Sequence, residues 1–178
     1  MNSTTSPLVS VVIPTYNSAK FITQAIDSVF NQTYSNYEVI VIDDGSIDNT
    51  LEIVESYQDK LNIKLITKAR QGNWVANTNH GLAVAQGKYA CFLHQDDLWL
   101  QGRLDIIKKA IATCPHASLY LHDSVFIDSE GKPLGLWRCP MSKEEVIPTK
   151  SMTEKLLVQN FIAIPAPVFN RQAALDLG

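Results

Sequence analysis

Two pairs of adjacent aspartates, Asp43-Asp44 and Asp96-Asp97, are the residues of this 178-residue chain best suited to chemistry. Each pair follows a short apolar run and precedes a polar loop. Adjacent carboxylates repel each other and raise each other's pKa unless a cation or hydrogen-bond donors lie between them. If both pairs end separate strands, they can converge on one divalent cation and on the polar ligand that the cation neutralises.

The same residues also suit a purely structural role. The sequence Asp43-Asp44-Gly45-Ser46 is a good turn, because Asp and Ser bond nearby backbone amides and Gly tolerates a positive φ. One carboxylate of Asp96-Asp97 can cap the helix expected from about Leu100. The functional interpretation is favoured because the same arrangement occurs twice at matching positions.

Apolar runs place both pairs at the ends of strands. The runs 38–42 and 89–93 are short and rich in β-branched or aromatic residues, which is typical of strands. They do not alternate with polar residues, as expected for strands buried on both faces of a parallel sheet. Open α/β sheets bind ligands at the carboxyl ends of their strands. Both aspartate pairs are therefore predicted to lie at one ligand site.

The N-terminal two thirds of the chain alternates between strand and helix signals. Strands are expected over 9–13, 38–42, 63–66 and 89–93, and helices over 18–30, 46–57, 73–86 and 100–111. Ser18 is the expected N-cap of the first helix, and Ser46 or Asp48 that of the second. Pro115 prevents the last helix from continuing. This order predicts an α/β fold with a doubly wound, mainly parallel sheet and right-handed crossovers.

The C-terminal third has a looser pattern. Residues 118–127 are expected to form one long strand, 128–132 a turn and 134–137 an antiparallel return strand. A helix is expected around 152–159, and 161–169 contains two prolines, which favours an edge strand or a loop. We therefore expect a single domain over 8–178 after a disordered tail, 1–7.

Composition limits the partners and the compartment. The net charge is −3 and no Lys/Arg cluster occurs, which argues against nucleic acid as a partner. Three widely spaced cysteines predict neither a disulfide framework nor a thiolate zinc site. The N-terminus does not resemble a secretory signal, and no apolar run is long enough to cross a bilayer. We expect a soluble protein in the cytoplasm or at the inner face of a membrane.

A metal-bound diphosphate is the ligand that these acids suit best. Mg²⁺ or Mn²⁺ binds few protein carboxylates, keeps some waters and fills its other positions with phosphate oxygens. Neither a G-x-G-x-x-G sequence nor a Walker motif is present to cradle phosphates with backbone amides. The metal must therefore provide more of the charge neutralisation.

Three segments together resemble the family 2 glycosyltransferases, which have the GT-A fold. They are Val9 to Asn17 with its Pro-Thr-Tyr-Asn end, Val41 to Ser46 with Asp48 and Thr50 beyond it, and Gly87 to Asp97. The segments occur in the order and spacing of that family. The resemblance implies an inverting, metal-dependent transfer of a sugar from a nucleotide-diphosphate donor, most simply a UDP-sugar. The implied acceptor is a glycan or a lipid-linked glycan.

The resemblance also implies roles for individual residues. Pro14, Thr15 and Tyr16 would line the base pocket. Asp44 would accept a hydrogen bond from the base, most simply from the imide N–H of uracil, and Asp96 would contact the ribose. Asp97 would ligate the Mn²⁺ or Mg²⁺ ion that bridges the two phosphates.

Several positions depart from the family pattern. His94 replaces the first aspartate of Asp-x-Asp-Asp, and a hydrogen-bonded structural role for it is favoured over metal ligation. Helical spacing places Asn73 and Asn77 on a polar side, where they either reach the nucleotide or face solvent. The same spacing places Asn79 on an apolar, buried side. Core packing is favoured for Trp74 over contact with the ligand.

The C-terminal segment also bears on catalysis. In the family, the segment resembling 167–178 is followed by a Glu-Asp pair whose acid deprotonates the acceptor hydroxyl, so the general base is expected beyond Gly178. The chain is therefore expected to bind donor far better than it transfers sugar. A nucleotide-sugar binding module without transferase activity is the alternative. A phosphoacceptor signalling domain fits less well, because the predicted hairpin has no role there.

Overall fold

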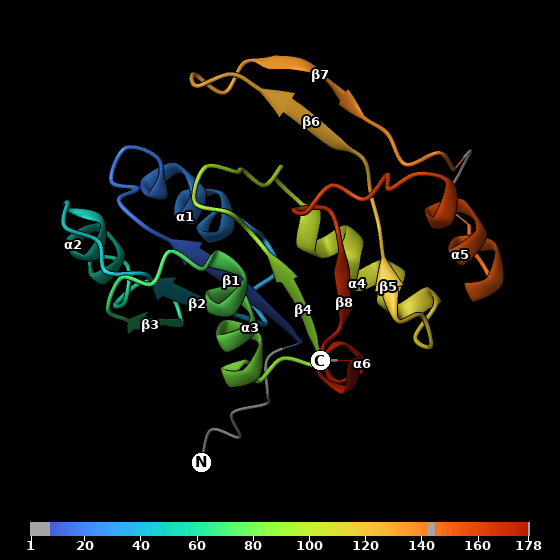
Figure 1. The fold of residues 1–178 in the computed structure, drawn as a ribbon, viewed down its shortest axis with the longest axis horizontal. Helices are drawn as coiled ribbons and strands as arrows, with labels where there is room; N and C mark the ends of the chain where they lie inside the picture. Colours follow the sequence, from blue (N-terminus) through green and yellow to red (C-terminus); the bar gives the residue numbers. More distant parts are fainter. Residues whose placement is uncertain (1–7, 142–144, 178) are drawn as a thin grey trace.

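The computed structural model describes residues 8–141 and 145–177 (Figure 1). The tail predicted over 1–7 lies outside the described residues, as do 142–144 and 178. The described chain forms a mixed six-stranded sheet covered by helices, and a separate two-stranded hairpin. The predicted α/β class is confirmed.

The main sheet has the strand order β3-β2-β1-β4-β8-β5. Its parallel part consists of β1 (Val9–Thr15), β2 (Tyr37–Asp43), β3 (Ile63–Thr67) and β4 (Tyr89–Phe92). The register places Thr15 opposite Asp43, so β1 and β2 end at the same edge of the sheet. At the other side of β4, the short strands β8 (Val168–Asn170) and β5 (Leu119–Tyr120) complete the sheet by antiparallel pairing.

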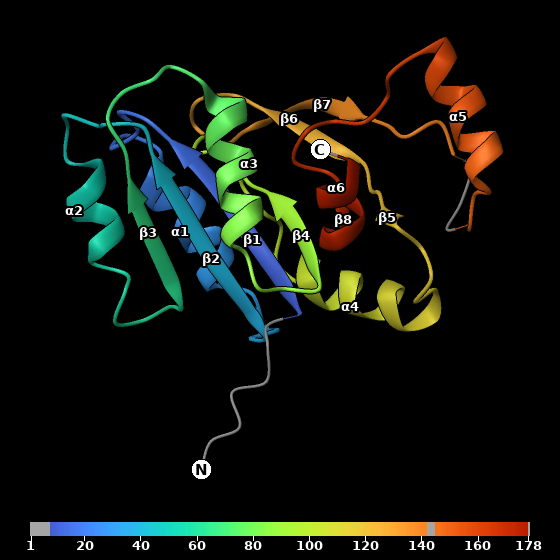
Figure 2. The ribbon, with the colours of Figure 1, turned by 60° about the horizontal axis from the view of Figure 1, so that its bottom comes forward.

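Helices cover both faces of the sheet, as the prediction of a doubly wound fold requires. Figure 2 shows α3 (Trp74–Val84) on one face and α1 (Ile22–Phe30) on the other. On the α1 face lie α2 (Thr50–Glu55) and α4 (Arg103–Thr113), and the core there includes Val11, Ile13, Val39, Val41, Ile26, Val54 and Leu104. Ile40 and Ile42 point to the α3 face and pack against Ala85. Both faces of β2 are therefore buried, which explains its continuous apolar run.

Close packing of α3 depends on a glycine. A Cβ atom on Gly81 would lie 2.4 Å from Cγ1 of Val12, a distance that real side chains do not tolerate. The absence of a side chain lets the helix approach β1 closely. This contact holds the N-terminal end of α3 beside the carboxyl edge of the sheet.

The predicted helix caps are partly wrong. Ser18 does not cap α1: its carbonyl accepts hydrogen bonds from the amides of Phe21 and Ile22, and its hydroxyl bonds Thr15 instead. The helix therefore begins later, at Ile22. For α2, Asp48 rather than Ser46 bonds the first helical amide, that of Thr50, at 3.0 Å.

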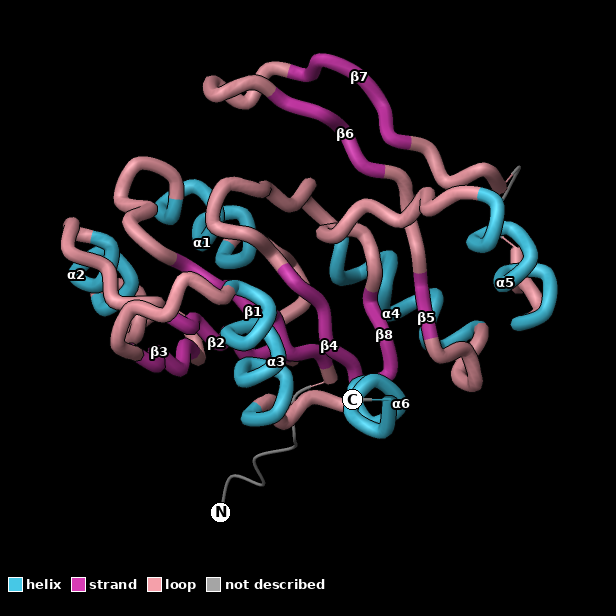
Figure 3. The backbone as a smooth tube through the Cα atoms, in the orientation of Figure 1, coloured by secondary structure: helices cyan, strands magenta, loops and turns pink. Residues whose placement is uncertain are grey.

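The long strand expected over 118–127 is also wrong. The chain breaks after β5 and continues as β6 (Ser124–Ile127), which pairs only with β7 (Pro133–Trp137) among the described strands. Polar bonds turn the chain at the break, because the Asp123 carboxylate accepts the amide of Cys139 at 2.8 Å. Figures 1 and 3 show the resulting hairpin standing apart from the main sheet. Its turn at Asp128–Lys132 is as predicted.

The last part of the chain contains the remaining elements. The helix expected around 152–159 is α5 (Thr149–Val158), and α6 (Arg171–Leu177) follows β8. The expectation of an edge strand or loop over 161–169 holds only up to Pro167, because β8 lies inside the sheet between β4 and β5. β8 begins directly after the second proline, where each residue again has an amide to donate.

None of the helices in the described ranges combines the length and the apolar character needed to cross a membrane.

Candidate functional site

A hollow of about 410 Å³ opens at the carboxyl edge of the parallel strands. The size is within the usual range for small-ligand sites, about 300–1,000 Å³. Its lining residues come from the ends of β1, β2 and β4, the loop before α3 and α3 itself: Pro14, Thr15, Tyr16, Asp44, Arg70, Gly72, Trp74, Asn77, His94, Gln95 and Asp96. All of the nucleotide-binding residues predicted from sequence, except Asn73, line this one hollow.

The two aspartates at the end of β2 have different environments. The Asp43 carboxylate is engaged in the turn that follows it. It accepts hydrogen bonds from the amides of Gly45 at 3.0 Å and Ser46 at 2.8 Å, and from the Ser46 hydroxyl. Asp44, the next residue, faces the hollow instead. The first pair therefore combines the structural role and the candidate ligand role, one in each residue.

Asp44 is buried among hydrogen-bond donors. Its carboxylate accepts the amides of Gln71 at 3.0 Å and Gly72 at 2.8 Å, and it forms an ion pair with Arg70. Burial raises the pKa of Asp44, but bonds from the Asn77 side chain, these two amides and Arg70 outweigh burial and lower it to about 2. Asp44 is therefore an ionised acceptor at neutral pH.

The loops after β1 and β2 are tied to each other. Asn17, at a positive φ of 45°, accepts the amide of Ile47 at 2.9 Å and donates its own amide to the Ser46 hydroxyl at 2.9 Å. Next to it, Asp48 accepts the amide of Ala19 at 3.1 Å. These bonds fix the spacing between Tyr16 and Asp44 across the hollow.

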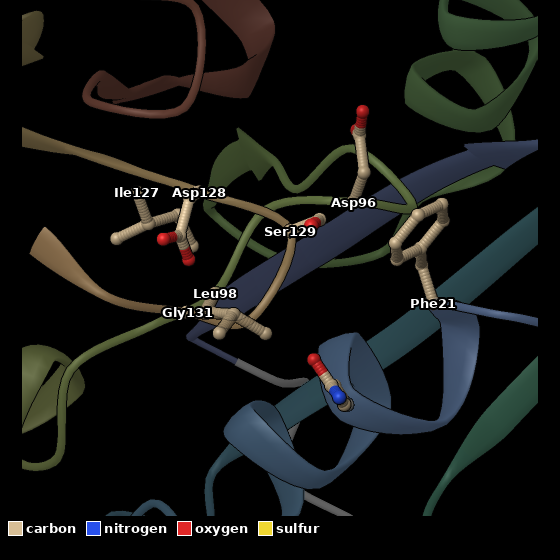
Figure 4. Close-up of a pocket in the computed structure, with 8 residues that line it drawn as sticks. Phe21, Asp96, Leu98, Ile127, Asp128, Ser129 and Gly131 are labelled. Atoms are coloured by element: carbon tan, nitrogen blue, oxygen red, sulfur yellow. The ribbon is translucent and has the colours of Figure 1, made fainter. Parts of the chain in front are cut away.

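Asp96 and Asp97 follow β4 and separate. Asp96 lines the main hollow and also a second one, of about 200 Å³, formed with Phe21, Leu98 and the turn of the hairpin (Figure 4). In that view its carboxylate points away from Leu98 and Gly131. Asp97 is half-buried and does not line either hollow. The predicted metal ligand therefore lines neither hollow, whereas Asp96 lines both.

The residues around Asp97 fit a divalent cation that takes its other ligands from a bound diphosphate and water. Burial, and next the charge of Asp96, raise the pKa of Asp97, whereas His94 opposes the rise, so a cation here would relieve the repulsion. Nε2 of His94 is buried without a hydrogen-bond partner. Among the described residues, no cluster of three or more His, Cys, Asp or Glu side chains could hold a metal ion by itself.

His94 and Trp74 do not take the roles favoured from sequence. His94 was expected to be hydrogen-bonded, but its buried Nε2 has no partner, and its ring packs edge-on against Trp74 with the ring centroids 5.6 Å apart. Trp74 is half exposed and lines the hollow rather than packing in the core. It stands at the first position of α3, above the edge of the sheet, where little core is available to cover it.

The polar side of α3, predicted either to reach the nucleotide or to face solvent, is partly buried. Asn77 is 2% exposed and accepts a hydrogen bond from Lys68 Nζ at 3.1 Å, whereas Asn79, expected to be buried, is exposed. Asn73 is the N-cap, accepting the amide of Ala76 at 3.0 Å, and it does not line the hollow. Asn77 can be buried at the sheet edge because Lys68 and Asp44 supply hydrogen-bond partners for its side chain.

Comparison with known proteins decides the family. The sequence matches the model of glycosyl transferase family 2 over residues 10–177. The chain belongs to glycosyl transferase family 2. The family resemblance inferred from the three sequence segments is confirmed.

Several family 2 proteins are similar to this chain. An uncharacterized glycosyltransferase of Nostoc sp. is 35% identical over 128 residues, covering 71% of this chain and 39% of the relative. The Escherichia coli protein WfgD, named UDP-Glc:alpha-D-GlcNAc-diphosphoundecaprenol beta-1,3-glucosyltransferase, is 38% identical over 99 residues, covering 56% of this chain and 39% of WfgD. The chain therefore spans about two fifths of the length of these relatives.

A solved structure shows the same fold. The crystal structure of Staphylococcus aureus TarS 1–349 in complex with UDP-GlcNAc aligns with a TM-score of 0.74 at 28% identity. The alignment covers 95% of this chain and 47% of the TarS chain. The GT-A fold predicted from sequence is confirmed.

This family 2 chain also has lining residues that sequence analysis did not assign to the site. Arg70 and Gly72 lie in the loop between β3 and α3, and Gln95 lies between the two motif positions His94 and Asp96. Arg70 gave no signal in the sequence, because its partner Asp44 lies 26 residues away. Gln95 gave no signal, because its partners are distant in the sequence.

Proposed function

We propose that this chain provides the donor-binding site of an inverting, metal-dependent glycosyltransferase. The donor is a nucleoside-diphosphate sugar, most simply a UDP-sugar, and the acceptor is a hydroxyl group of a glycan or lipid-linked glycan. One observation carries the proposal: a single hollow contains the Tyr16 ring, the ionised Asp44 and the Asp96 carboxylate, supplied by three neighbouring strand ends. The UDP-GlcNAc complex of TarS and the name of WfgD support the choice of donor.

The residues divide between the parts of the donor. Pro14, Thr15 and Tyr16 form the wall on which the base stacks, and Asp44 accepts an N–H group of the base. Asp96 contacts the ribose, at the boundary between the two hollows.

Asn77 and Asn73 differ in their proposed roles in nucleotide binding. Asn77 lines the hollow and reaches the nucleotide beside Asp44. Asn73 acts indirectly, because its side chain is engaged in capping the helix that carries Asn77.

Asp97 would hold the divalent cation, Mn²⁺ or Mg²⁺, with Asp96 and His94 next to it. When bound, the cation supplies Lewis-acid stabilisation of the departing diphosphate. The protein's own residues orient the donor and exclude water from one side of it. We assign no residue of this chain to the deprotonation of the acceptor hydroxyl.

Calorimetry with UDP in the presence of Mn²⁺ tests the proposal. We expect the wild-type chain to bind UDP and Asp44→Ala to bind it roughly 10- to 100-fold more weakly, because a hydrogen bond to a charged group is lost. Asp59→Ala, which removes an exposed carboxylate from the end of the α2 region, is the matched control and should bind like wild type. A wild-type chain that binds no UDP, or an Asp44→Ala variant that binds it equally well, would rule out the site.

A further inference from the structure

Arg70 occupies the part of the hollow where a planar base would have to stack. The central carbon of its guanidinium group lies 3.7 Å from the centroid of the Tyr16 ring. The same group forms an ion pair with Asp44. Tyr16, Asp44 and Arg70 all line the main hollow.

These are the contacts that the proposed function assigns to the base. A guanidinium is flat and carries N–H donors along its edge, and it stacks on aromatic faces. A pyrimidine is also flat, and its imide N–H is a donor at the ring edge. Arg70 therefore combines, in one side chain, a stacking face for Tyr16 and a donor for Asp44.

The loop that carries Arg70 is held independently of its side chain. Backbone amides of Gln71 and Gly72 bond Asp44, at 3.0 and 2.8 Å. Gly45, at a φ of +79°, lets this loop approach closely. A Cβ atom on Gly45 would lie 2.8 Å from the backbone nitrogen of Arg70. The loop can thus stay in place when the guanidinium moves.

The side chain itself is free to leave. It is 48% exposed, so its removal from Tyr16 uncovers no core, while Asp44 at 4% exposure keeps its two amide donors. The cation–π contact is exposed and therefore weak, and the Asp44 carboxylate keeps its two amide donors when the ion pair breaks. Displacement by a ligand therefore has a modest cost.

We propose that Arg70 is an affinity-setting residue that fills the base position in the ligand-free protein and is displaced by a nucleoside base with an edge N–H. This inference rests on the proposed function. It makes Arg70 a competitor of the base for both Tyr16 and Asp44. Removing the competitor strengthens base binding, whereas removing an ordinary binding residue weakens it.

Titration with uridine, which has no phosphate, isolates the base contacts. We expect Arg70→Ala to bind uridine about 5- to 10-fold more tightly than wild type in an NMR titration, given the strength of an exposed cation–π contact with its ion pair. Arg70→Lys keeps the charge but loses the flat, forked group, so it should also bind more tightly than wild type. Lys60→Ala removes a cation lying over Tyr57, at 5.4 Å, outside the hollow and should leave the affinity unchanged.

The NMR signal of the Arg70 Nη1–H group, which donates to Asp44, gives a second measure. We expect it to be protected from exchange in the free protein and to lose protection when uridine is added. Equal or weaker uridine binding by Arg70→Ala, or wild-type affinity in Arg70→Lys, would overturn the inference even if the chain binds UDP. A wild-type chain that binds no UDP with Mn²⁺ would remove the proposed function and this inference with it.

Discussion

The Gln95 side chain joins the end of β4 to the end of β1, because its Oε1 atom accepts the backbone amide of Tyr16 at 2.8 Å. The same oxygen accepts the Thr15 hydroxyl at 3.0 Å. One amide group therefore holds the backbone of Tyr16, the residue on whose ring the base is proposed to stack.

We predict that Gln95→Ala and Gln95→Met both weaken UDP binding, since neither can hold the Tyr16 backbone. The unfolding free energy should fall by about 1–2 kcal/mol, since two part-buried hydrogen bonds are lost. Calorimetry with UDP and chemical denaturation measure the two effects. Gln58→Ala, at an exposed position, serves as the control, and unchanged UDP affinity in both Gln95 variants would contradict the prediction.

The ionisation of Asp44 predicts a specific pH dependence. Its pKa in the folded chain is about 2, below the ordinary value of 3.8, because the donors around it outweigh burial. The ionised group therefore stabilises the fold fully above pH 3.8, and this contribution is lost as the pH falls through about 2. The difference in unfolding free energy between wild type and Asp44→Asn should be constant above about pH 5 and should shrink towards pH 2.

Denaturant unfolding of both proteins at a series of pH values checks this. Asp59→Asn is the matched control and should show no such change. A wild-type to Asp44→Asn difference that stays constant down to pH 2 would mean that Asp44 is not held ionised by its donors.

The proposed cation at Asp97 predicts a change in metal dependence rather than a simple loss of binding. Wild type should bind UDP more tightly with Mn²⁺ than after chelation with EDTA, because the cation neutralises the diphosphate. Asp97→Ala should bind UDP with one affinity in both conditions, close to that of chelated wild type. Calorimetry with and without Mn²⁺ measures this, and an Asp97→Ala variant that still responds to Mn²⁺ would place the cation elsewhere.

The contact between Gly81 and Val12 predicts a stability effect with a rescue. Gly81→Ala should destabilise the chain, since overpacking costs about 1–3 kcal/mol and exceeds the roughly 1 kcal/mol that alanine gains over glycine in a helix. Val12→Ala opens space beside the new methyl group, so the double variant should lose less than the sum of the single losses. Gly135→Ala, which meets no atom within 4 Å, should be nearly neutral.

Thermal or denaturant unfolding of the four variants gives the coupling. Additive losses in the double variant would show that the helix does not press on Val12. UDP binding by Gly81→Ala would also report whether a shift of α3 reaches Asn77.

The strands that position the site were predictable because their apolar runs have few alternative structures. Val39 to Ile42 suits a strand buried on both faces, and the strand must end where Asp43 begins a polar turn. Alternation of strand and helix then fixes the parallel order, and with it the edge at which the acids meet.

Other features could not be predicted, because they depend on contacts between distant residues. Gln95 and Tyr16 lie 79 residues apart, and Arg70 and Asp44 lie 26 apart. The spacing along α3 shows that Asn77 and Asn79 face different ways, but not which side packs on the sheet. That choice depends on Gly81 fitting against Val12 and on Lys68 supplying a partner for Asn77. The break between β5 and β6 likewise depends on the bond from the distant Cys139 amide to Asp123.

Successive side chains at the end of β2 point in opposite directions, so the strand does not tolerate a change of length by one residue. Inserting a single amino acid between Tyr37 and Asp43 would place the turn-forming carboxylate at the hollow, and deleting one would place the ligand-facing carboxylate at the turn. Length changes in the loop that precedes Tyr37 carry no such penalty. Natural variation among descendants of this gene should therefore place gaps before β2 and spare the strand itself.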